Sequence, residues 1–199
     1  RREDGYFSES FVNMLAFLGW NPGTEQELFG LEELIAAFEL TKVGRSGSKF
    51  DQEKAKWFQH QYLIRKSNTE LTALFIPELN KHLPNKEVEN TYVQQVIGLV
   101  KERATFVKDL WDLSSFFFVA PDSYDAKAAK KNWKEGSSEL MTELTVKLAA
   151  IEDFSSENVE KSVKEWIQSK EIGFGKVMQP LRLSLVGALK GPHLFDIAA

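Results

Sequence analysis

The sequence predicts an all-α fold, built as two or three small helical bundles packed end to end. Apolar residues recur at spacings of three and four along nearly the whole chain, as they do on the buried face of a helix. No stretch of four or more residues alternates cleanly between apolar and polar with turn signals at both ends, as a half-buried strand would. With 199 residues, 43% of them apolar, the chain can bury one sizeable core or two modest ones.

The first third of the chain predicts three helices. The first covers residues 7–18 and ends at Gly19, just before a turn that contains proline. The second is centred on residues 31–38. The third follows Asp51, because an aspartate at this position can accept hydrogen bonds from the first free amides of a helix.

The remaining helices are predicted from caps and breakers. Ser67 and Glu70 have the spacing of a capping box and start a fourth helix, which Pro77 is expected to kink or end. Apolar residues from 88 to 113 predict one long helical stretch, terminated by the segment 120–122. Further helical patterns begin near residues 126, 140, 159 and 177. The joints between bundles are expected near residues 65–68 and 120–123.

Charge gives no bulk signal for a polyanionic partner. The net charge is −4, and no region of the chain is basic as a whole, although nucleic-acid binding depends on basic residues that neutralise phosphates. Any such contact must come from a local stripe of basic side chains, whose alternative reading is a solvated helix face. The candidate stripes are Arg45/Lys49, Arg65/Lys66, Lys101/Arg103/Lys108 and Lys127/Lys130/Lys131/Lys134.

Catalytic and metal-binding patterns are missing from the sequence. The chain has no cysteine, and its three histidines do not have the i, i+4 spacing with which a helix binds zinc. The small-residue loop at 44–49 lacks the order of a phosphate-binding P-loop. Neighbouring carboxylates such as Glu152 and Asp153 splay apart on a helix, which suits solvent rather than acid–base catalysis. We therefore expect no catalytic site, no metal site and no membrane span, in a cytoplasmic protein.

Several separated motifs resemble the C-terminal half of bacterial glutamyl-tRNA synthetases. Residues 5–20, GYFSESFVNMLAFLGW, are similar to the segment that follows the second catalytic motif of that family. The similarity continues through residues 29–35, FGLEELI, and 49–51, KFD. It returns near the end in residues 175–182, GKVMQPLR, and 194–197, LFDI.

This resemblance implies a division of labour along the chain. Residues 1–66 correspond to a helical domain that contacts the tRNA stem, and residues 67–199 to a helical anticodon-binding domain of the class I synthetase type, with a possible sub-boundary near 120. The catalytic domain, which binds ATP and Mg²⁺, lies upstream in the family. The chain alone is thus expected to need no cofactor and to be inactive, while the full-length protein ligates glutamate to tRNA(Glu), its partner, as a monomer.

The resemblance also assigns anticodon-reading residues. Arg103 corresponds to an arginine that stands at the third anticodon base, where glutamate and glutamine tRNAs differ as C and G. The fixed donors of a guanidinium can pair with the acceptors of a splayed-out cytosine while crowding guanine. Arg182 corresponds to the arginine that attends the first base, with Pro180 and Leu181 expected to hold the start of its helix. The alternative for Arg103 is a surface arginine paired with Glu102 or Asp109.

Two shorter segments complete the implied tRNA contacts. Gly191, Pro192 and Leu194 correspond to a segment that lines the middle anticodon base, although many relatives have Thr or Ser in place of Gly191. The alternative reading of Pro192 and Leu194 is a helix-ending turn and a core leucine. A second set, in the glycine-rich loop, is expected near the tRNA backbone: Arg45, Ser46 and Lys49.

Two other functions stay open at this point. One is a helical protein-interaction module without an RNA role, which burial of Arg103 or Arg182 in an ion pair would favour. The other is a non-discriminating synthetase that charges both glutamate and glutamine tRNAs. Arg103 argues against the second, because non-discriminating members often lack arginine there.

Overall fold

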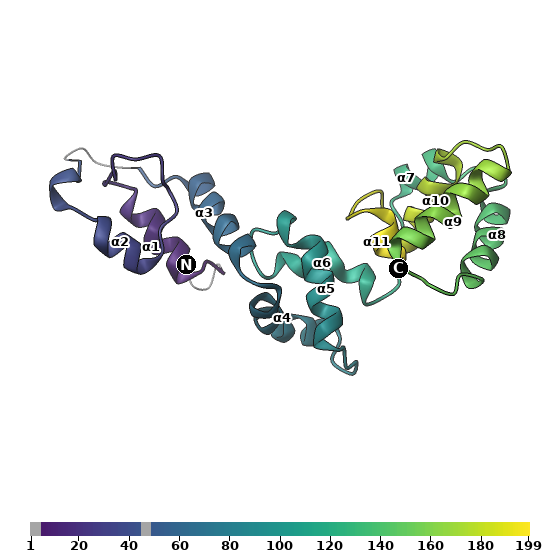
Figure 1. The fold of residues 1–199 in the computed structure, drawn as a ribbon, viewed down its shortest axis with the longest axis horizontal. Coiled ribbons are helices and arrows are strands. Elements are labelled where there is room, and N and C mark those ends of the chain that lie inside the picture. The colour runs from purple at the N-terminus through teal and green to yellow at the C-terminus, as the bar shows by residue number, and fades with distance from the viewer. Residues whose placement is uncertain (1–4, 45–48) are drawn as a thin grey trace. The chain divides into compact units, whose positions relative to one another are not determined.

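Helices make up every regular element of the computed structural model, which describes residues 5–44 and 49–199 (Figure 1). These ranges contain no β-strand, and a single isolated antiparallel bridge joins Trp20 to Val43. The predicted all-α class is confirmed. None of the described helices is both long and apolar enough to cross a lipid bilayer.

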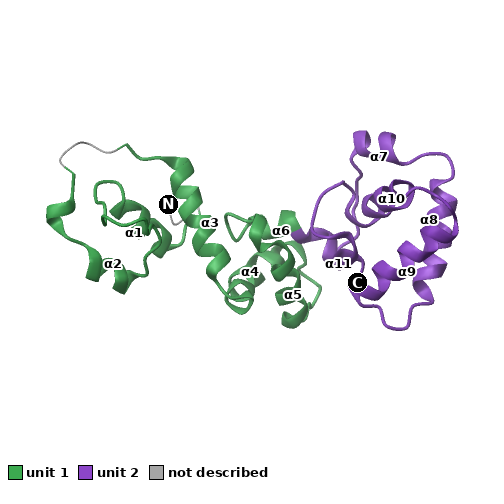
Figure 2. Cartoon of the chain, turned by 45° about the horizontal axis from the view of Figure 1, so that its top comes forward, with its two compact units in different colours: residues 1–113 green, residues 114–199 purple. Residues whose placement is uncertain are grey.

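The chain divides into two compact units, residues 1–113 and 114–199 (Figure 2). The first holds α1 (Ser8–Ala16), α2 (Leu31–Ala37), η1 (Leu40–Lys42), α3 (Gln52–Arg65), α4 (Asn68–His82), α5 (Asn90–Val100), η2 (Lys101–Arg103) and nearly all of α6 (Asp109–Ser114). The second holds η3 (Ser115–Phe117), α7 (Ala126–Asn132), α8 (Ser137–Ala149), α9 (Ser156–Ser169), α10 (Gly175–Val186) and α11 (Leu194–Ala198). The predicted functional boundary at 66/67 falls between α3 and α4, inside the first unit, and stays a prediction, as does the sub-boundary near 120.

Helices α1 and α3 pack against each other and form one core of the first unit. Met14 of α1 meets Ala55 and Phe58 of α3, and the Phe58 side chain is fully buried. Removing an aromatic or aliphatic side chain of this size from water contributes roughly 1.5–3 kcal/mol. The first and third predicted helices thus meet in one core.

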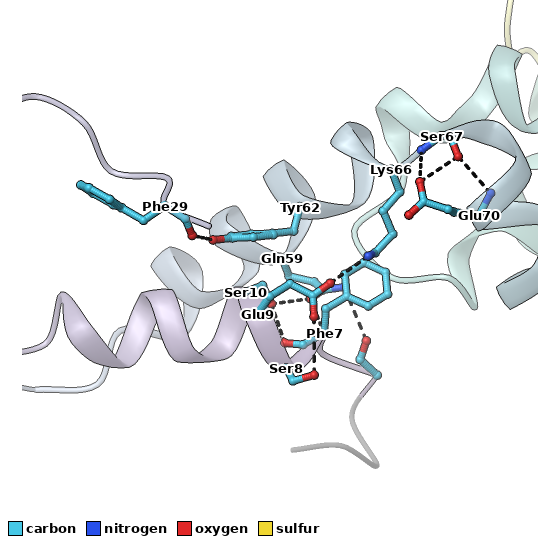
Figure 3. A network of polar contacts seen from close by, with 11 residues as sticks. Phe7, Ser8, Glu9, Ser10, Phe29, Gln59, Tyr62, Lys66, Ser67 and Glu70 are labelled. Carbon is cyan, nitrogen blue, oxygen red and sulfur yellow. Dashed lines mark hydrogen bonds and ion pairs between the residues drawn. The ribbon is translucent and has the colours of Figure 1, made fainter. Parts of the chain in front are cut away.

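A buried glutamine ties the start of α1 to α3 (Figure 3). The side-chain oxygen of Gln59 accepts a hydrogen bond from the Phe7 amide at 2.8 Å and another from the Ser10 hydroxyl at 2.7 Å. Phe7 is the N-cap residue of α1 and offers no side-chain cap. Gln59 therefore satisfies a backbone amide at the helix start that would otherwise be buried without a partner.

An ion pair also joins α1 to Lys66, the C-cap residue of α3. Lys66 Nζ lies 2.8 Å from Glu9 Oε1, and both groups are drawn in Figure 3. Partial burial pushes the pKa of Glu9 upward, but hydrogen bonds from Lys66, from the backbone at Glu9 and from Ser8, together with the positive charge of Lys66, outweigh it, so that pKa lies below its ordinary value. The folded state therefore favours the ionised carboxylate.

The N-caps predicted for α3 and α4 are both confirmed. Asp51 accepts hydrogen bonds from the amides of Glu53 and Lys54 at the start of α3. At the start of α4, the Glu70 amide donates to Ser67 Oγ at 3.1 Å and the Ser67 amide donates to Glu70 Oε2 at 2.8 Å. These are the two reciprocal bonds of a capping box, so α3 and α4 are separated by a sharp and well-satisfied turn.

Pro77 does not end α4, which continues five residues beyond it to His82. A proline removes the amide that would bond to the carbonyl four residues earlier, here Ala73. Both Pro77 and Ala73 are exposed, so water can satisfy that carbonyl. Meanwhile Leu71, Phe75 and Leu79 on the opposite face are buried and hold α4 in place.

The single helical stretch predicted over residues 88–113 is wrong. Helix α5 ends at Val100, the short η2 carries the chain to Arg103, and Ala104 is extended with φ −91° and ψ 140°. A separate helix, α6, begins at Asp109. The periodicity was misleading because Val100 and Leu110, on the two sides of the break, are both buried.

The second unit is organised around α9, whose inward face carries three fully buried residues. Val159, Val163 and Ile167 lie four residues apart and pack with Leu144 of α8 and Val177 of α10. Pro180 was expected at the start of its helix, but α10 begins at Gly175, so that expectation is wrong. The proline sits buried inside α10, and the exposed Lys176 carries the carbonyl that loses its partner.

Candidate nucleic-acid interface

Arg103 is the last residue of η2 and its side chain is exposed. Its Nη1 donates one long hydrogen bond, 3.3 Å, to the carbonyl of Leu99. In the part of the chain that the structure describes, it forms no ion pair with Glu102 or Asp109. A guanidinium with most of its donors open to solvent can bind a planar acceptor-rich partner such as a base edge or a phosphate.

The backbone that carries Arg103 is anchored to α3 from both sides. His60 Nδ1 lies 2.7 Å from the carbonyl oxygen of Ala104, and because a carbonyl can only accept, Nδ1 donates. Lys101 Nζ donates to the carbonyl of Lys66 at 3.1 Å. Sequence spacing gave His60 no role, since its partner lies 44 residues away.

Asp109 explains why the chain turns after Arg103. One of its carboxylate oxygens, Oδ2, accepts from the amides of Thr105 and Phe106 at 3.0 and 2.8 Å. Two amides bound to one carboxylate hold the connection between η2 and α6 in a tight turn. Asp109 is thereby occupied by the backbone, which leaves the Arg103 guanidinium for a ligand.

Arg182 lies in the last two turns of α10 and binds the loop that follows it. Its Nη1 donates to the carbonyls of Lys190 and Pro192 at 2.9 and 2.8 Å. The residue between these two acceptors is Gly191, whose φ of +99° is in the region that favours glycine. The structure thus brings together Arg182, Gly191 and Pro192, three of the residues that the sequence predicted for anticodon contact.

Gly191 is closely surrounded within the second unit. A Cβ added there would lie 3.1 Å from Cζ of Phe116 and 3.4 Å from Cδ1 of Ile197. Both the backbone conformation and the neighbouring ring therefore favour glycine at this position. A hydroxyl contact with RNA is not offered by this chain at residue 191.

Pro192 and Leu194 are buried rather than presented on the surface. Leu194 is only 5% exposed and packs in the core with residues of α9 and α10. Its side chain takes the core role that the sequence left open as the alternative. The predicted contacts of Pro192 and Leu194 with the middle anticodon base stay predictions.

The predicted tRNA-backbone contacts fall in the glycine-rich loop. Lys49 is exposed, two residues before the N-cap Asp51. Arg45 and Ser46 lie outside the described residues. Arg103 belongs to the first unit and Arg182 to the second.

No group of three or more His, Asp or Glu side chains within residues 5–44 and 49–199 could hold a metal ion. The carboxylates with a lowered pKa are engaged in caps and surface pairs. Hydrogen bonds from the hydroxyl and amide of Ser67 lower the pKa of Glu70, and a hydrogen bond from Lys81 lowers that of Glu78. These shifts follow from helix capping and i,i+3 pairing rather than from a catalytic arrangement.

Comparison with known proteins gives a consistent set of relatives. Residues 70–199 match the family model described as "Anticodon binding domain". A glutamate–tRNA ligase of Christiangramia forsetii is 57% identical over 199 residues, 99% of this chain and 39% of that protein. One of Flavobacterium johnsoniae is 57% identical over 196 residues, 98% of this chain and 38% of that protein.

A solved structure supports the same relationship. The crystal structure of a glutamate tRNA ligase from Elizabethkingia meningosepticum, in complex with its amino acid, aligns with a TM-score of 0.93 at 46% identity. The alignment covers 98% of this chain and 38% of that one. The chain therefore spans well under half the length of the relatives it matches.

Proposed function

The chain belongs to the anticodon-binding domain family, in the form found in glutamate–tRNA ligases, and we propose that it binds tRNA(Glu) and reads its anticodon. In this proposal residues 67–199 hold the anticodon loop and residues 1–66 contact the stem. The ligation of glutamate, with ATP and Mg²⁺, belongs to the part of the ligase outside this chain. The protein acts as a monomer in the cytoplasm.

The observation that carries the proposal is the state of Arg103. Its guanidinium is exposed, makes one long bond to the Leu99 carbonyl of α5 and is free of ion pairs among the described residues. Its backbone is fixed by hydrogen bonds to α3. A rigidly mounted, unpaired guanidinium is suited to discriminate cytosine from guanine at the third anticodon base, because its donors cannot match both bases in one position.

Arg182 supports the proposal differently, because two of its bonds go to the 190–192 loop. A guanidinium has five N–H groups spread over three nitrogens, so one arginine can contact a loop and a base together. In this proposal Arg182 attends the first anticodon base, while the loop that its Nη1 holds borders the middle base. The loop and the arginine then form one reading surface.

The two alternative functions are less well supported. A protein-interaction module without an RNA role is not favoured by the family match of residues 70–199. A non-discriminating ligase, which charges glutamine tRNA as well, is disfavoured by the free guanidinium at Arg103. The experiment below separates it from the discriminating form.

The test uses the full-length ligase and two tRNA(Glu) transcripts that differ only at the third anticodon base, C or G. We expect kcat/KM to fall roughly tenfold or more with G, because one well-oriented base contact is worth about 1–3 kcal/mol by analogy with DNA readout. Equal kcat/KM on both transcripts would make the protein non-discriminating. Failure to bind either transcript would exclude the RNA-binding role altogether.

A further inference from the structure

The lysines of α7 gather on one side of that helix. Lys127, Lys130 and Lys131 have spacings of three and four, which put their side chains on one helical face. Lys134 follows just beyond the helix end, and its Nζ donates to the carbonyl of Lys130 at 2.9 Å. All four side chains are exposed.

A surface cavity of about 380 Å³ extends this basic face to another helix. Its wall includes Lys131 and Lys134 from the α7 end and Lys176 from the first turn of α10. The carboxylate on that wall is Glu135, which leaves three positive and one negative side chain, a local charge of +2. The chain as a whole has a net charge of −4, so the charge of this cavity is opposite in sign to that of the whole chain.

These lysines are not neutralised in the folded protein. Elsewhere in the described residues lysines such as Lys66, Lys81 and Lys164 lie within ion-pair distance of a carboxylate. Among the residues that the structure describes, Lys131, Lys134 and Lys176 have no carboxylate within that distance. Like charges held close together repel each other, so the arrangement is more favourable when an anion lies between them.

Backbone contacts hold the segments that carry these lysines in fixed positions. The amide of Lys134 donates to Ser137 Oγ at 2.9 Å, and the Ser137 amide returns a bond to the Lys134 carbonyl at 3.0 Å. Ser137 is the first residue of α8 and is buried. The turn that carries Lys134 is therefore fixed to α8, while α7 packs against α10.

We infer that the cavity lined by Lys131, Lys134 and Lys176, with Lys127 and Lys130 beside it, is a second tRNA contact that binds backbone phosphates. The inference rests on the proposed function, because it takes tRNA as the polyanion that the ligase meets. The anticodon-reading role proposed above involves none of these lysines, and this contact would give them a function. Such contacts add affinity without base preference, since phosphates carry no sequence information.

The test is the salt dependence of tRNA binding by the full-length ligase. Each lost phosphate contact lowers the slope of log K against log salt by about 0.7–0.9. The variant Lys131→Gln/Lys134→Gln/Lys176→Gln is therefore expected to lose about 2 or more from that slope, with equal loss for the C and G transcripts. A matched control, Lys147→Gln/Lys161→Gln/Lys164→Gln, changes the net charge equally outside the cavity and is expected to change the slope by less than 1.

The outcomes separate this inference from the proposed function. If the cavity variant and the control variant have the same slope and affinity, the cavity serves another anionic partner or none, and the inference fails while anticodon reading stands. If the wild type shows no preference between transcripts, it is anticodon reading that fails. Thermal unfolding shows whether the triple variant folds, and if it does not, Lys131→Gln alone must still lower the slope by about 0.7–0.9.

Discussion

Nη1 of Arg182 lies 2.8 Å from the carbonyl oxygen of Pro192, ten residues further along the chain. The same nitrogen also holds the carbonyl of Lys190. The arginine proposed to read the first base is thus also the group that fixes the loop proposed for the middle base. Substitutions at residue 182 therefore act on both elements at once.

The first prediction separates these two roles of Arg182. Arg182→Ala removes both loop bonds and should lower the free energy of unfolding by roughly 1–2 kcal/mol, the value of two partly exposed charge-assisted hydrogen bonds. It should also lower kcat/KM for tRNA(Glu) without improving the use of glutamine tRNA. Arg182→Lys keeps the charge but not the planar pair of donors, so its kcat/KM should also fall. A lysine variant with full activity would limit the role of residue 182 to charge.

The second prediction concerns the end of α10. Gly187 has φ +79°, and an added Cβ would lie 2.6 Å from the carbonyl oxygen of Ser123 and 3.0 Å from Cβ of Pro121. Gly187→Ala should therefore destabilise the protein by about 2 kcal/mol or more, the sum of left-handed strain and the backbone clash.

Gly136 provides the matched control. Its φ is +82°, but an added Cβ there would meet nothing within 4 Å. Gly136→Ala should cost only the left-handed strain, about 1 kcal/mol. Urea denaturation of both variants checks the difference, and equal losses of stability would mean that the contact with Ser123 relaxes without cost.

The third prediction follows from the Glu9–Lys66 pair. Because the folded state lowers the pKa of Glu9, the pair stabilises the protein above the unfolded pKa of about 4.3, and this contribution disappears as the pH falls through the folded value. Glu9→Gln should therefore flatten the loss of stability below about pH 5. With the Glu9 side chain 39% exposed, the effect at neutral pH should be only about 0.5 kcal/mol.

The control is Glu53→Gln, which removes the ion pair between Glu53 and Lys56. The Glu53 side chain is 82% exposed. That variant should leave the acid limb of the stability curve nearly unchanged. If Glu9→Gln and Glu53→Gln gave identical pH profiles, the link between α1 and the end of α3 would contribute nothing beyond a surface pair.

Local signals in the sequence predicted local structure well. The capping box at Ser67 and Glu70 and the N-cap at Asp51 involve residues only two or three positions apart, so their geometry follows from spacing alone. Leu34, Phe58 and Val163 are buried apolar residues of helices that the periodicity predicted.

Contacts between distant residues could not be predicted in this way. The break at Ala104 depends on His60, 44 positions away, and on Asp109, which binds backbone amides rather than an arginine. The loop bonds of Arg182 need the path of residues 187–192, which turns at two glycines with positive φ. The prolines were misleading in both helices, because Pro77 and Pro180 are tolerated where the residue whose carbonyl loses its hydrogen bond is exposed.

The fourth prediction tests base reading directly and concerns Arg103→Gln in the full-length ligase. Glutamine propagates a helix about as well as arginine, so η2 and its anchors to α3 should remain. The exposed charged fork is lost, and discrimination against glutamine tRNA should shrink by about tenfold or more. Aminoacylation of tRNA(Glu) at saturation should change little, since the proposed function places the ligation chemistry outside this chain.

The deciding measurement is the ratio of kcat/KM for glutamate tRNA to kcat/KM for glutamine tRNA, in the wild type and in Arg103→Gln. Base reading by Arg103 predicts that this ratio falls in the variant by about tenfold or more, because a contact worth roughly 1–3 kcal/mol is removed for only one of the two tRNAs. Equal loss of kcat/KM on both tRNAs, with the ratio unchanged, would contradict it and leave Arg103 a role in stability or backbone contact alone.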